Sequence, residues 1–136
     1  MIETLSHITF IVTDLARMSH FLITIFDAKE IYSSDERNFS KSKEKFFLIK
    51  EFWIAIMEGK SISQKSYNHV AFKIAEIDFD KYFNRIQSLG VKILKDRGRI
   101  KGEGKSIYFY DYDNHLFELH TGTLEQRLKS YQKPKI

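Results

Sequence analysis

Two short stretches of this 136-residue chain resemble each other, and their likeness decides the fold. The first is "LSHITFIV", from Leu5 to Val12, and the second is "YNHVAFKI", from Tyr67 to Ile74. Each has histidine as its third residue, followed by β-branched and aromatic residues that favour an extended strand. His7 and His69 are 62 residues apart (69 − 7), so the pattern predicts an internal repeat of about that length.

The residues that follow each histidine strand continue the repeat. Apolar residues recur at helical spacing from Thr13 onward and again from Ala75 onward. Each helical segment is followed by three β-like segments, which are 30–33, 45–50 and 52–58 in the first half and 91–94, 106–111 and 115–120 in the second. The pattern predicts an α+β fold of tandem βαβββ modules, and no linker rich in proline or glycine separates them. We therefore expect residues 1–136 to form a single domain, with module one at about 1–60, module two at about 65–125, and a short solvated C-terminal tail.

Local signals mark the ends of these elements. Thr13 or Asp14 can cap the first helix, and Gly90 can end the second one. The stretch "DYDNH", from Asp111 to His115, predicts a hairpin turn, because Asn114 tolerates a left-handed backbone. Two polar, irregular segments, 33–45 and 95–105, fall between the second and third strands of their modules. Loops at such equivalent places are where functional side chains are expected.

Composition excludes several classes of protein. With 43% hydrophobic and 29% charged residues the chain is typical of a globular domain, and without cysteine it has neither a disulfide nor a thiol nucleophile. The net charge of +4 arises from 22 basic residues scattered among 18 acidic ones, which fits a small anionic substrate better than a nucleic acid. No apolar run approaches the roughly 20 residues of a membrane span. The N-terminus also lacks a secretory pattern, so we expect a cytoplasmic protein.

Strand alternation places candidate metal ligands on one face of each module. His7 and Thr9 share a face of the first strand, and His69 occupies the matching face of its counterpart. Glu118 lies in the otherwise apolar run "HLFELH", where a carboxylate is costly to bury unless it is paired or binds a metal. Either histidine alone is more typical of a structural residue, but their equivalence under the repeat favours a shared site. Two imidazoles and a carboxylate suit Mn²⁺, Fe²⁺, Zn²⁺ or Ni²⁺.

Paired βαβββ modules with His, His and Glu on their strands resemble the vicinal-oxygen-chelate superfamily. That superfamily includes lactoylglutathione lyases, extradiol dioxygenases and fosfomycin-resistance enzymes. The segment "SIYFYDYDNHLFELHTGTLEQRL", Ser106 to Leu128, is similar to the part of fosfomycin-resistance proteins that carries the glutamate ligand and, nine residues later, a phosphonate-binding arginine. "LSHITFIVTDL" is similar to their N-terminal strand.

The resemblance implies a manganese site and a phosphonate site. The implied ligands of Mn²⁺ are His7, His69 and Glu118. The implied phosphonate contacts are Thr9, Tyr108 and Arg127, joined in the 95–105 loop and just after it by Arg99 (or Arg97), Lys105 and Ser106. In the family two chains share each site, so the resemblance implies a homodimer in which His7 of one chain meets His69 and Glu118 of the other. The first module lacks a counterpart of Glu118, because residues 54–57 are all apolar.

One segment favours a particular reaction within the family. "FSKSKEKFFLI", Phe39 to Ile49, is similar to the segment that carries the general base of the manganese-dependent epoxide hydratase subgroup, and the matching residue is Glu44. Water is a poor nucleophile at neutral pH and needs such a positioned base. The resemblance therefore predicts that the chain hydrates the epoxide of fosfomycin to a vicinal diol and so confers antibiotic resistance.

Three alternatives remain open from the sequence. A bacillithiol or glutathione transferase acting on fosfomycin would depend on the thiol, although Lys101 and Lys105 stand where glutathione-using relatives have a potassium-binding loop. An iron-dependent dioxygenase would need O₂ and would be a larger protein. A non-catalytic antibiotic-binding protein of the same fold would protect its host stoichiometrically, without turnover.

Overall fold

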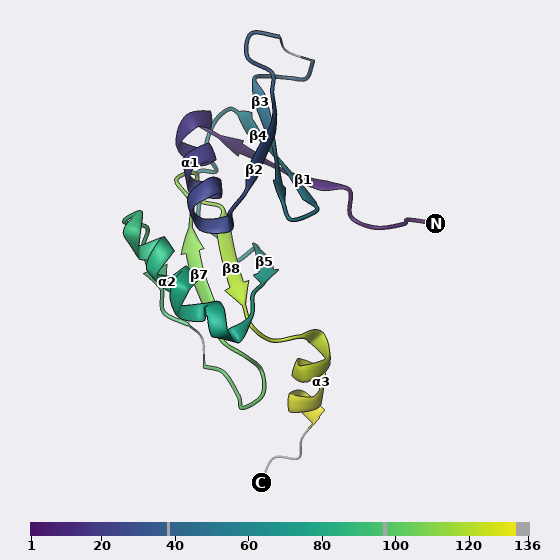
Figure 1. The fold of residues 1–136 in the computed structure, drawn as a ribbon, viewed down its shortest axis with the longest axis vertical. Coiled ribbons are helices and arrows are strands. Elements are labelled where there is room, and N and C mark those ends of the chain that lie inside the picture. The colour runs from purple at the N-terminus through teal and green to yellow at the C-terminus, as the bar shows by residue number, and fades with distance from the viewer. Residues whose placement is uncertain (38, 97, 133–136) are drawn as a thin grey trace. The chain divides into compact units, whose positions relative to one another are not determined.

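The computed structural model of the chain describes residues 1–37, 39–96 and 98–132. The chain divides into two compact units (Figure 1). The first comprises residues 1–65 with the turn 111–115, and the second comprises residues 66–110 with the chain from residue 116 onward. No described helix is both long enough and apolar enough to cross a membrane.

The first unit is a four-stranded sheet with one helix. Its elements in chain order are β1 (His7–Val12), α1 (Leu15–Phe26), β2 (Lys29–Ser33), β3 (Glu44–Ile49) and β4 (Phe52–Glu58). The strand order in the sheet is β1-β4-β3-β2, with β1 parallel to β4 and the other pairs antiparallel. Asp14 caps α1, because its carboxylate accepts a hydrogen bond from the Arg17 backbone N–H at 2.9 Å.

The second unit repeats this plan. Its elements are β5 (His69–Lys73), a short 3₁₀ turn η1 (Glu76–Asp78), α2 (Phe79–Ser88), β6 (Ile93–Leu94), β7 (Ser106–Tyr110), β8 (Leu116–His120) and α3 (Leu124–Gln132). The strand order is β5-β8-β7-β6, again with only the first pair parallel. The predicted α+β fold of tandem βαβββ modules is confirmed. Helix α3 was not predicted, because its residues were assigned to the end of module two and a solvated tail.

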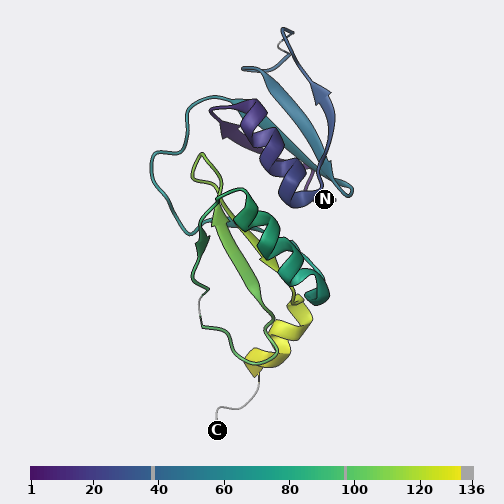
Figure 2. The same ribbon diagram turned by 60° about the vertical axis from the view of Figure 1, so that its left-hand side comes forward.

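Helices α1 and α2 each cover one face of their own sheet (Figure 2) and leave the other face uncovered by a helix. The apolar stripe of α1 is fully buried and consists of Met18, Phe21, Leu22 and Ile25. It meets buried residues of β3 and β4, namely Phe47, Ile54 and Ile56. In the second unit Ile86 of α2 is fully buried, as are the stacked rings of Phe109 and Phe117. The alternation of β1 predicted that Phe10 and Val12 face the core, and both are buried.

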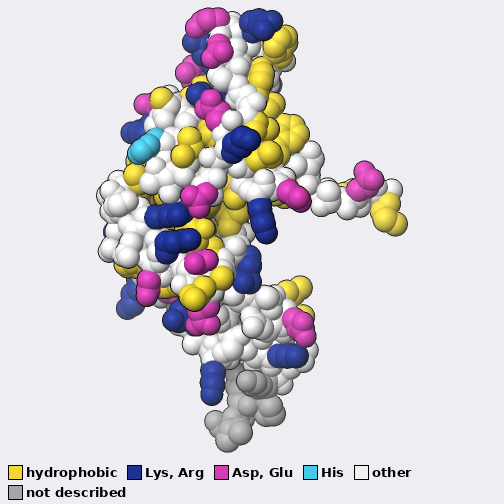
Figure 3. Space-filling model, in the orientation of Figure 1, with side chains coloured by type: hydrophobic (Ala, Val, Ile, Leu, Met, Phe, Trp, Pro, Cys, Tyr) yellow, Lys and Arg dark blue, Asp and Glu magenta, His cyan; other side chains and the backbone are white. Residues whose placement is uncertain are grey.

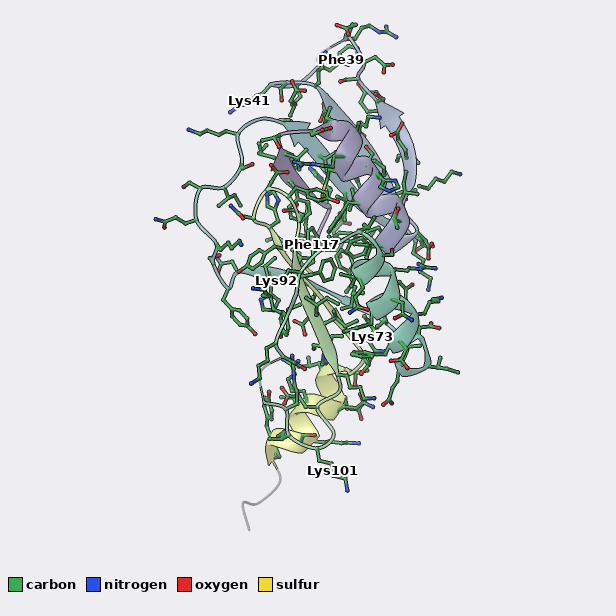
Figure 4. The ribbon with its side chains drawn as sticks, turned by 90° about the vertical axis from the view of Figure 1, so that its left-hand side faces the viewer. Phe39, Lys41, Lys73, Lys92, Lys101 and Phe117 are labelled. Atoms are coloured by element: carbon green, nitrogen blue, oxygen red, sulfur yellow. The ribbon has the colours of Figure 1, made fainter. Side chains whose placement is uncertain are left out.

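The predicted turns have the expected backbone. Gly90 follows α2 with φ of 70°, and Asn114 in the β7–β8 turn also has φ of 70°. Asp111 closes that turn by accepting hydrogen bonds from the backbone N–H groups of Asp113 at 2.9 Å and His115 at 2.8 Å. In the first unit, Phe39 and Lys41 lie on the loop between β2 and β3 (Figure 4).

Candidate metal centre

The second sheet gathers polar side chains on the face that α2 does not cover. Residues paired across neighbouring strands point to the same face, so the strand register defines rows of neighbours. One row joins Ala71, Glu118 and Tyr108. The rows on either side run through His69, Leu116 and Tyr110, and through Lys73, His120 and Ser106. His69, Glu118 and Tyr108 are therefore neighbours although 49 residues (118 − 69) separate the first two.

His69 and Glu118 form the centre of this face. Nε2 of His69 lies 3.0 Å from Oε1 of Glu118, whose side chain is only 5% exposed. Nδ1 of the same imidazole lies 2.7 Å from the backbone carbonyl oxygen of Tyr67. Because a carbonyl oxygen can only accept, Nδ1 carries the proton and Nε2 is the nitrogen directed at the carboxylate. A backbone carbonyl that fixes the tautomer in this way is a common partner of a metal-ligating histidine.

The donor set fits a hard divalent cation. A metal-ligating imidazole nitrogen carries a lone pair and no proton, and with the proton on Nδ1 the Nε2 of His69 can offer its lone pair to a cation that Oε1 of Glu118 also contacts. Adjacent ligands of an octahedral ion with bonds of ~2.1 Å lie about 3 Å apart, which matches this spacing. No set of three His, Asp or Glu side chains is close enough to hold an ion in the part of the chain that the structure describes. His7, the other predicted ligand, belongs to the first unit.

The second oxygen of Glu118 is held by neutral and cationic donors. The Ser106 hydroxyl donates to Oε2 at 2.5 Å, and Nη2 of Arg99 lies 3.4 Å from the same oxygen. Oγ of Ser106 is also 2.7 Å from Nδ1 of His120. Burial lowers the pKa of His120 below its usual value, and this outweighs the opposing effect of the Glu118 charge. His120 is therefore a neutral neighbour of the carboxylate.

Arg99 and Tyr108 extend the site beyond the carboxylate. Nη2 of Arg99 donates to the Tyr108 hydroxyl at 2.7 Å and to Oγ of Ser106 at 2.8 Å. The Tyr67 hydroxyl donates to that of Tyr108 at 3.2 Å. Burial raises the pKa of Tyr108 to about 12, and the negative charge of Glu118 makes a smaller contribution in the same direction. Tyr108 thus keeps its proton at neutral pH and can donate to an anion.

Arg127 and Lys105, which the sequence also predicted as phosphonate contacts, have different surroundings. Arg127 lines a cavity of about 220 Å³ together with His120, and its Nη2 lies 3.4 Å from the His120 Nε2. Lys105 is directed elsewhere, since its Nζ lies 3.8 Å from a carboxylate oxygen of Glu76 and 5.5 Å from the ring centre of Phe79. Arg97, the alternative to Arg99, lies outside the described residues.

The first sheet carries the remaining predicted site residues on one face. The register joins Ile11, Met57 and Glu44 in one row, and Thr9 and Ala55 in the row beside it. Glu44 is 8% exposed, and Ser34 holds its backbone through two hydrogen bonds of 3.0 Å. His7 and Thr9 are exposed. The imidazole of His7 stacks on Trp53 with ring centres 4.0 Å apart.

Three residues of these faces were not assigned a role from the sequence. Trp53 supports His7, the Tyr67 carbonyl orients His69, and the nearly buried Glu103 binds Arg99. The repeat could have identified Trp53, because it pairs with His7 across the parallel strands β1 and β4. A backbone carbonyl leaves no signal in a sequence, and a glutamate in a polar loop has the pattern of a solvated charge.

Comparisons with known proteins agree with the fold. Residues 4–119 match the model of the Glyoxalase/Bleomycin resistance protein/Dioxygenase superfamily, and the chain belongs to that superfamily. Within it, the chain is 62% identical to the fosfomycin resistance protein FosX of Listeria innocua, over 98% of this chain and 100% of that one. It is 37% identical to the metallothiol transferase FosB of Staphylococcus saprophyticus, over 99% of this chain and 87% of that one.

The chain is also similar to solved structures of FosX proteins. A crystal structure of a FosX variant from Listeria monocytogenes, in complex with Mn(II) and 1S,2S-dihydroxypropylphosphonic acid, superposes with a TM-score of 0.89. The two sequences are 58% identical, and the match covers 97% of this chain and 100% of that one. FosX from Mesorhizobium loti superposes with a TM-score of 0.85 at 56% identity, over 95% of this chain and 99% of that one. The sequence-based assignment to the fosfomycin-resistance proteins is confirmed.

Proposed function

We propose that this chain is a Mn(II)-dependent hydratase that opens the epoxide of fosfomycin to a vicinal diol. The observation that carries the proposal is the pairing of His69 with Glu118 beside Tyr108 and Arg99, in a chain 62% identical to a FosX protein over nearly its whole length. The phosphonate diol bound with Mn(II) to a FosX variant is what adding water to this epoxide yields. Water adds across one C–O bond, so the reaction needs no other reactant.

His69 and Glu118 would hold Mn(II), with His7 as the third ligand. Nε2 of His69 and Oε1 of Glu118 are already directed at each other, and the Tyr67 carbonyl fixes the required tautomer. We propose a homodimer in which His7 of one chain completes the site formed by His69 and Glu118 of the other. When bound, Mn(II) supplies Lewis acidity that stabilises negative charge developing on the epoxide oxygen.

The basic and hydroxyl groups would hold the phosphonate. Arg99 suits this role better than Lys105, because its guanidinium contacts Ser106 and Tyr108 whereas the ammonium of Lys105 lies beside Glu76. An arginine fork can contact two phosphonate oxygens at once. The Tyr108 hydroxyl would donate a hydrogen bond to a phosphonate oxygen. Arg127 and Thr9 would make the further contacts with the phosphonate. Held in this way, the epoxide is presented to water in one orientation.

Glu44 would act as the general base. Its carboxylate would take a proton from water as the oxygen attacks the ring carbon that bears phosphorus. The epoxide oxygen would leave that carbon and gain a proton from solvent to become the second hydroxyl of the diol, while Glu44 returns its proton to solvent. In the strand register Glu44 lies on the same face of its sheet as His7 and Thr9, so all three can serve one site.

Phosphorus NMR of fosfomycin tests the proposal. The protein is incubated with fosfomycin and Mn(II), first without thiol and then with glutathione or bacillithiol, beside a chelator-treated control. The expected product is the diol in the absence of thiol. A product that forms only with thiol would identify a transferase, and protection without turnover would identify a binding protein. The cytoplasmic location stays a prediction from the sequence.

A further inference from the structure

Glu103 is an almost fully buried carboxylate to which the mechanism gives no role. Glu103 lies in the loop before β7, and its side chain is 1% exposed. Its Oε1 is 3.1 Å from Nη1 of Arg99 and 3.9 Å from Nε of Arg127. Its Oε2 accepts the backbone N–H of Ile100 at 3.2 Å. A buried charge this well surrounded is costly to disturb, because its partners would lose a charge-assisted bond in a medium of low dielectric.

The C-terminal helix holds this carboxylate from the other side. The hydroxyl of Tyr131 on α3 donates to Oε1 of Glu103 at 2.6 Å. The Ser130 hydroxyl donates to the backbone carbonyl oxygen of Lys101 at 3.0 Å, which fastens the same loop to α3 (Figure 4). A Cβ atom on Gly102 would approach Oγ of Ser130 to 2.5 Å, so loop and helix are in close contact. Helix α3 therefore helps to hold in place the loop that carries Arg99.

We propose that Glu103, held by Tyr131 of α3, is a positioning residue that fixes the Arg99 guanidinium at the anion end of the site. The proposal rests on the proposed function, because it assumes that Arg99 receives the phosphonate. Glu103 binds Nη1 of Arg99, and Nη2 is thereby directed at Tyr108 and Ser106. Tyr131 acts through Glu103 and has no role in the chemistry itself.

Glu103 also keeps Arg99 from capturing the metal-binding carboxylate. Nη2 of Arg99 lies 3.4 Å from Oε2 of Glu118, which is longer than its bond to Tyr108. A guanidinium with both its ends free prefers a bidentate pair with one carboxylate. Without Glu103, Arg99 can turn to pair with Glu118 in that way, and it would then compete with the cation for Glu118 and leave the anion without its fork. The arrangement in place divides Arg99 among three carboxylates, because its Nε also lies 3.4 Å from Oδ1 of Asp96.

Tyr131→Phe tests the role of the helix, because it removes one hydroxyl and changes no charge. The readout is calorimetric binding of methylphosphonate, which has no epoxide, to the Mn(II)-loaded protein. A charge-assisted bond that is only partly transmitted to Arg99 should weaken binding about three- to tenfold. The KM for fosfomycin should rise by the same factor, with kcat within about twofold. Tyr82→Phe, which removes a hydroxyl from α2 of the same unit, is the matched control and should change neither value.

Glu103→Gln tests whether the charge of Glu103 positions Arg99. Combined with Tyr131→Phe, it completes a double-mutant cycle. Removing the charge alone would strengthen anion binding, whereas losing the position of Arg99 weakens it, so weaker methylphosphonate binding selects positioning. Mn(II) affinity should also fall, by roughly tenfold, as Arg99 moves toward Glu118. If Tyr131 acts only through Glu103, the double variant should bind methylphosphonate as Glu103→Gln does. Thermal unfolding of each variant identifies any loss of the fold.

The outcomes separate this proposal from the proposed function. Weaker methylphosphonate binding in both variants supports the positioning role even if phosphorus NMR detects no diol, and the reaction alone would then be wrong. Unchanged methylphosphonate binding in a folded Tyr131→Phe variant overturns the role of the helix. Unchanged or tighter methylphosphonate binding in a folded Glu103→Gln variant overturns the role of the carboxylate, whether or not fosfomycin is hydrated.

Discussion

The two sheets share one topology but carry different chemistry at equivalent positions. Row by row, Thr9, Ala55 and Phe46 of the first sheet match Ala71, Glu118 and Tyr108 of the second. The second sheet thus places a carboxylate and a hydroxyl where the first has a methyl group and a phenyl ring. The repeat therefore has two equivalent histidines, but only the second sheet has a carboxylate in the row beside its histidine.

A second difference concerns the neighbours of the two histidines. His69 faces Glu118 and is fixed by a backbone carbonyl, whereas His7 stacks on Trp53 and its Nδ1 lies 3.0 Å from Oγ of Ser6. At the start of the third strand, however, the first sheet carries Glu44 where the second carries Ser106. Under the proposed function the repeat would therefore divide the tasks. The second sheet would supply the ligand pair and most of the anion contacts, and the first would supply the base, a single imidazole and the hydroxyl of Thr9.

The sharpest test of this division is the removal of the base from the first sheet. Glu44→Gln should lower turnover of fosfomycin by about 10²–10⁴-fold, because an amide cannot accept the proton of water. Mn(II) binding, followed by electron paramagnetic resonance, should be unchanged, since Glu44 is not a ligand. Glu51→Gln, an exposed position of the same unit, is the control. Full hydratase activity in Glu44→Gln would assign the base elsewhere.

The next largest effect should come from the carboxylate of the second sheet. Glu118→Gln should weaken Mn(II) binding on the order of 100-fold or more, which exceeds the usual cost of losing an outer hydrogen-bond partner. Titration of the metal-free protein with Mn(II) measures the change. Glu125→Gln changes a surface residue that pairs with Lys129 and should have no effect. A variant that keeps its affinity would show that the cation is held without Glu118.

The first sheet should not tolerate the carboxylate that the second one carries. Ala55→Glu places a charge at a position that is 2% exposed and should lower the free energy of unfolding by about 3 kcal/mol. Urea denaturation gives the difference, and Ala75→Glu introduces the same side chain at an exposed position as the control. Undiminished stability would mean that the new carboxylate finds a cation or a donor, and that the two sheets are closer in chemistry than their sequences suggest.

A smaller effect is expected where a hydroxyl supports the carboxylate. Ser106→Ala removes the donor at 2.5 Å from Oε2 of Glu118 and should weaken Mn(II) binding about tenfold. Ser88→Ala, which removes an exposed hydroxyl from the end of α2, is the matched control. Equal affinities in the two variants would leave Ser106 a role in substrate binding alone.

The smallest effect concerns the pair Tyr108 and Phe46. Because burial raises the pKa of Tyr108 from 10.0 to about 12, the unfolded chain ionises this phenol before the folded one does. Its contribution to stability is therefore fully present below pH 10 and is lost as the pH rises toward 12. Tyr108→Phe, which copies the first sheet, should lose stability less steeply over that range. Unfolding free energies measured from pH 9 to pH 12 would reveal the difference, and parallel curves would contradict the shift.

The elements of the fold followed closely from local patterns. The last strand of the first unit, Phe52–Glu58, has the predicted ends, and β1 and β5 follow the matching stretches around His7 and His69. The predicted strand 91–94 is shorter, at Ile93–Leu94, since only these residues pair with β7. Helix α3 was not predicted, because hydrogen bonds from Tyr131 and Ser130 hold it to the rest of the unit. The acceptors of these bonds lie 28 and 29 residues away in the sequence.

The candidate site was only partly accessible to sequence reasoning. Alternation along a strand placed His69 on a definite face, and a carboxylate in the otherwise apolar run "HLFELH" indicated Glu118 as its partner. No local pattern could choose between Arg99 and Lys105, which lie six residues apart (105 − 99) in one irregular loop. Arg99 is held inward by Glu103 and Tyr108, while Lys105 lies beside Glu76.

The sequence by itself determined the repeat, the strand faces and the identity of the groups that can bind a cation, because a two-residue period is a local property of an extended chain. Only the tertiary structure decided which nitrogen of His69 is presented to Glu118, which cation of the loop turns inward, and that α3 supports that loop. Each of these depends on hydrogen bonds between residues that lie apart in the chain, and such bonds form only when packing brings buried donors to buried acceptors.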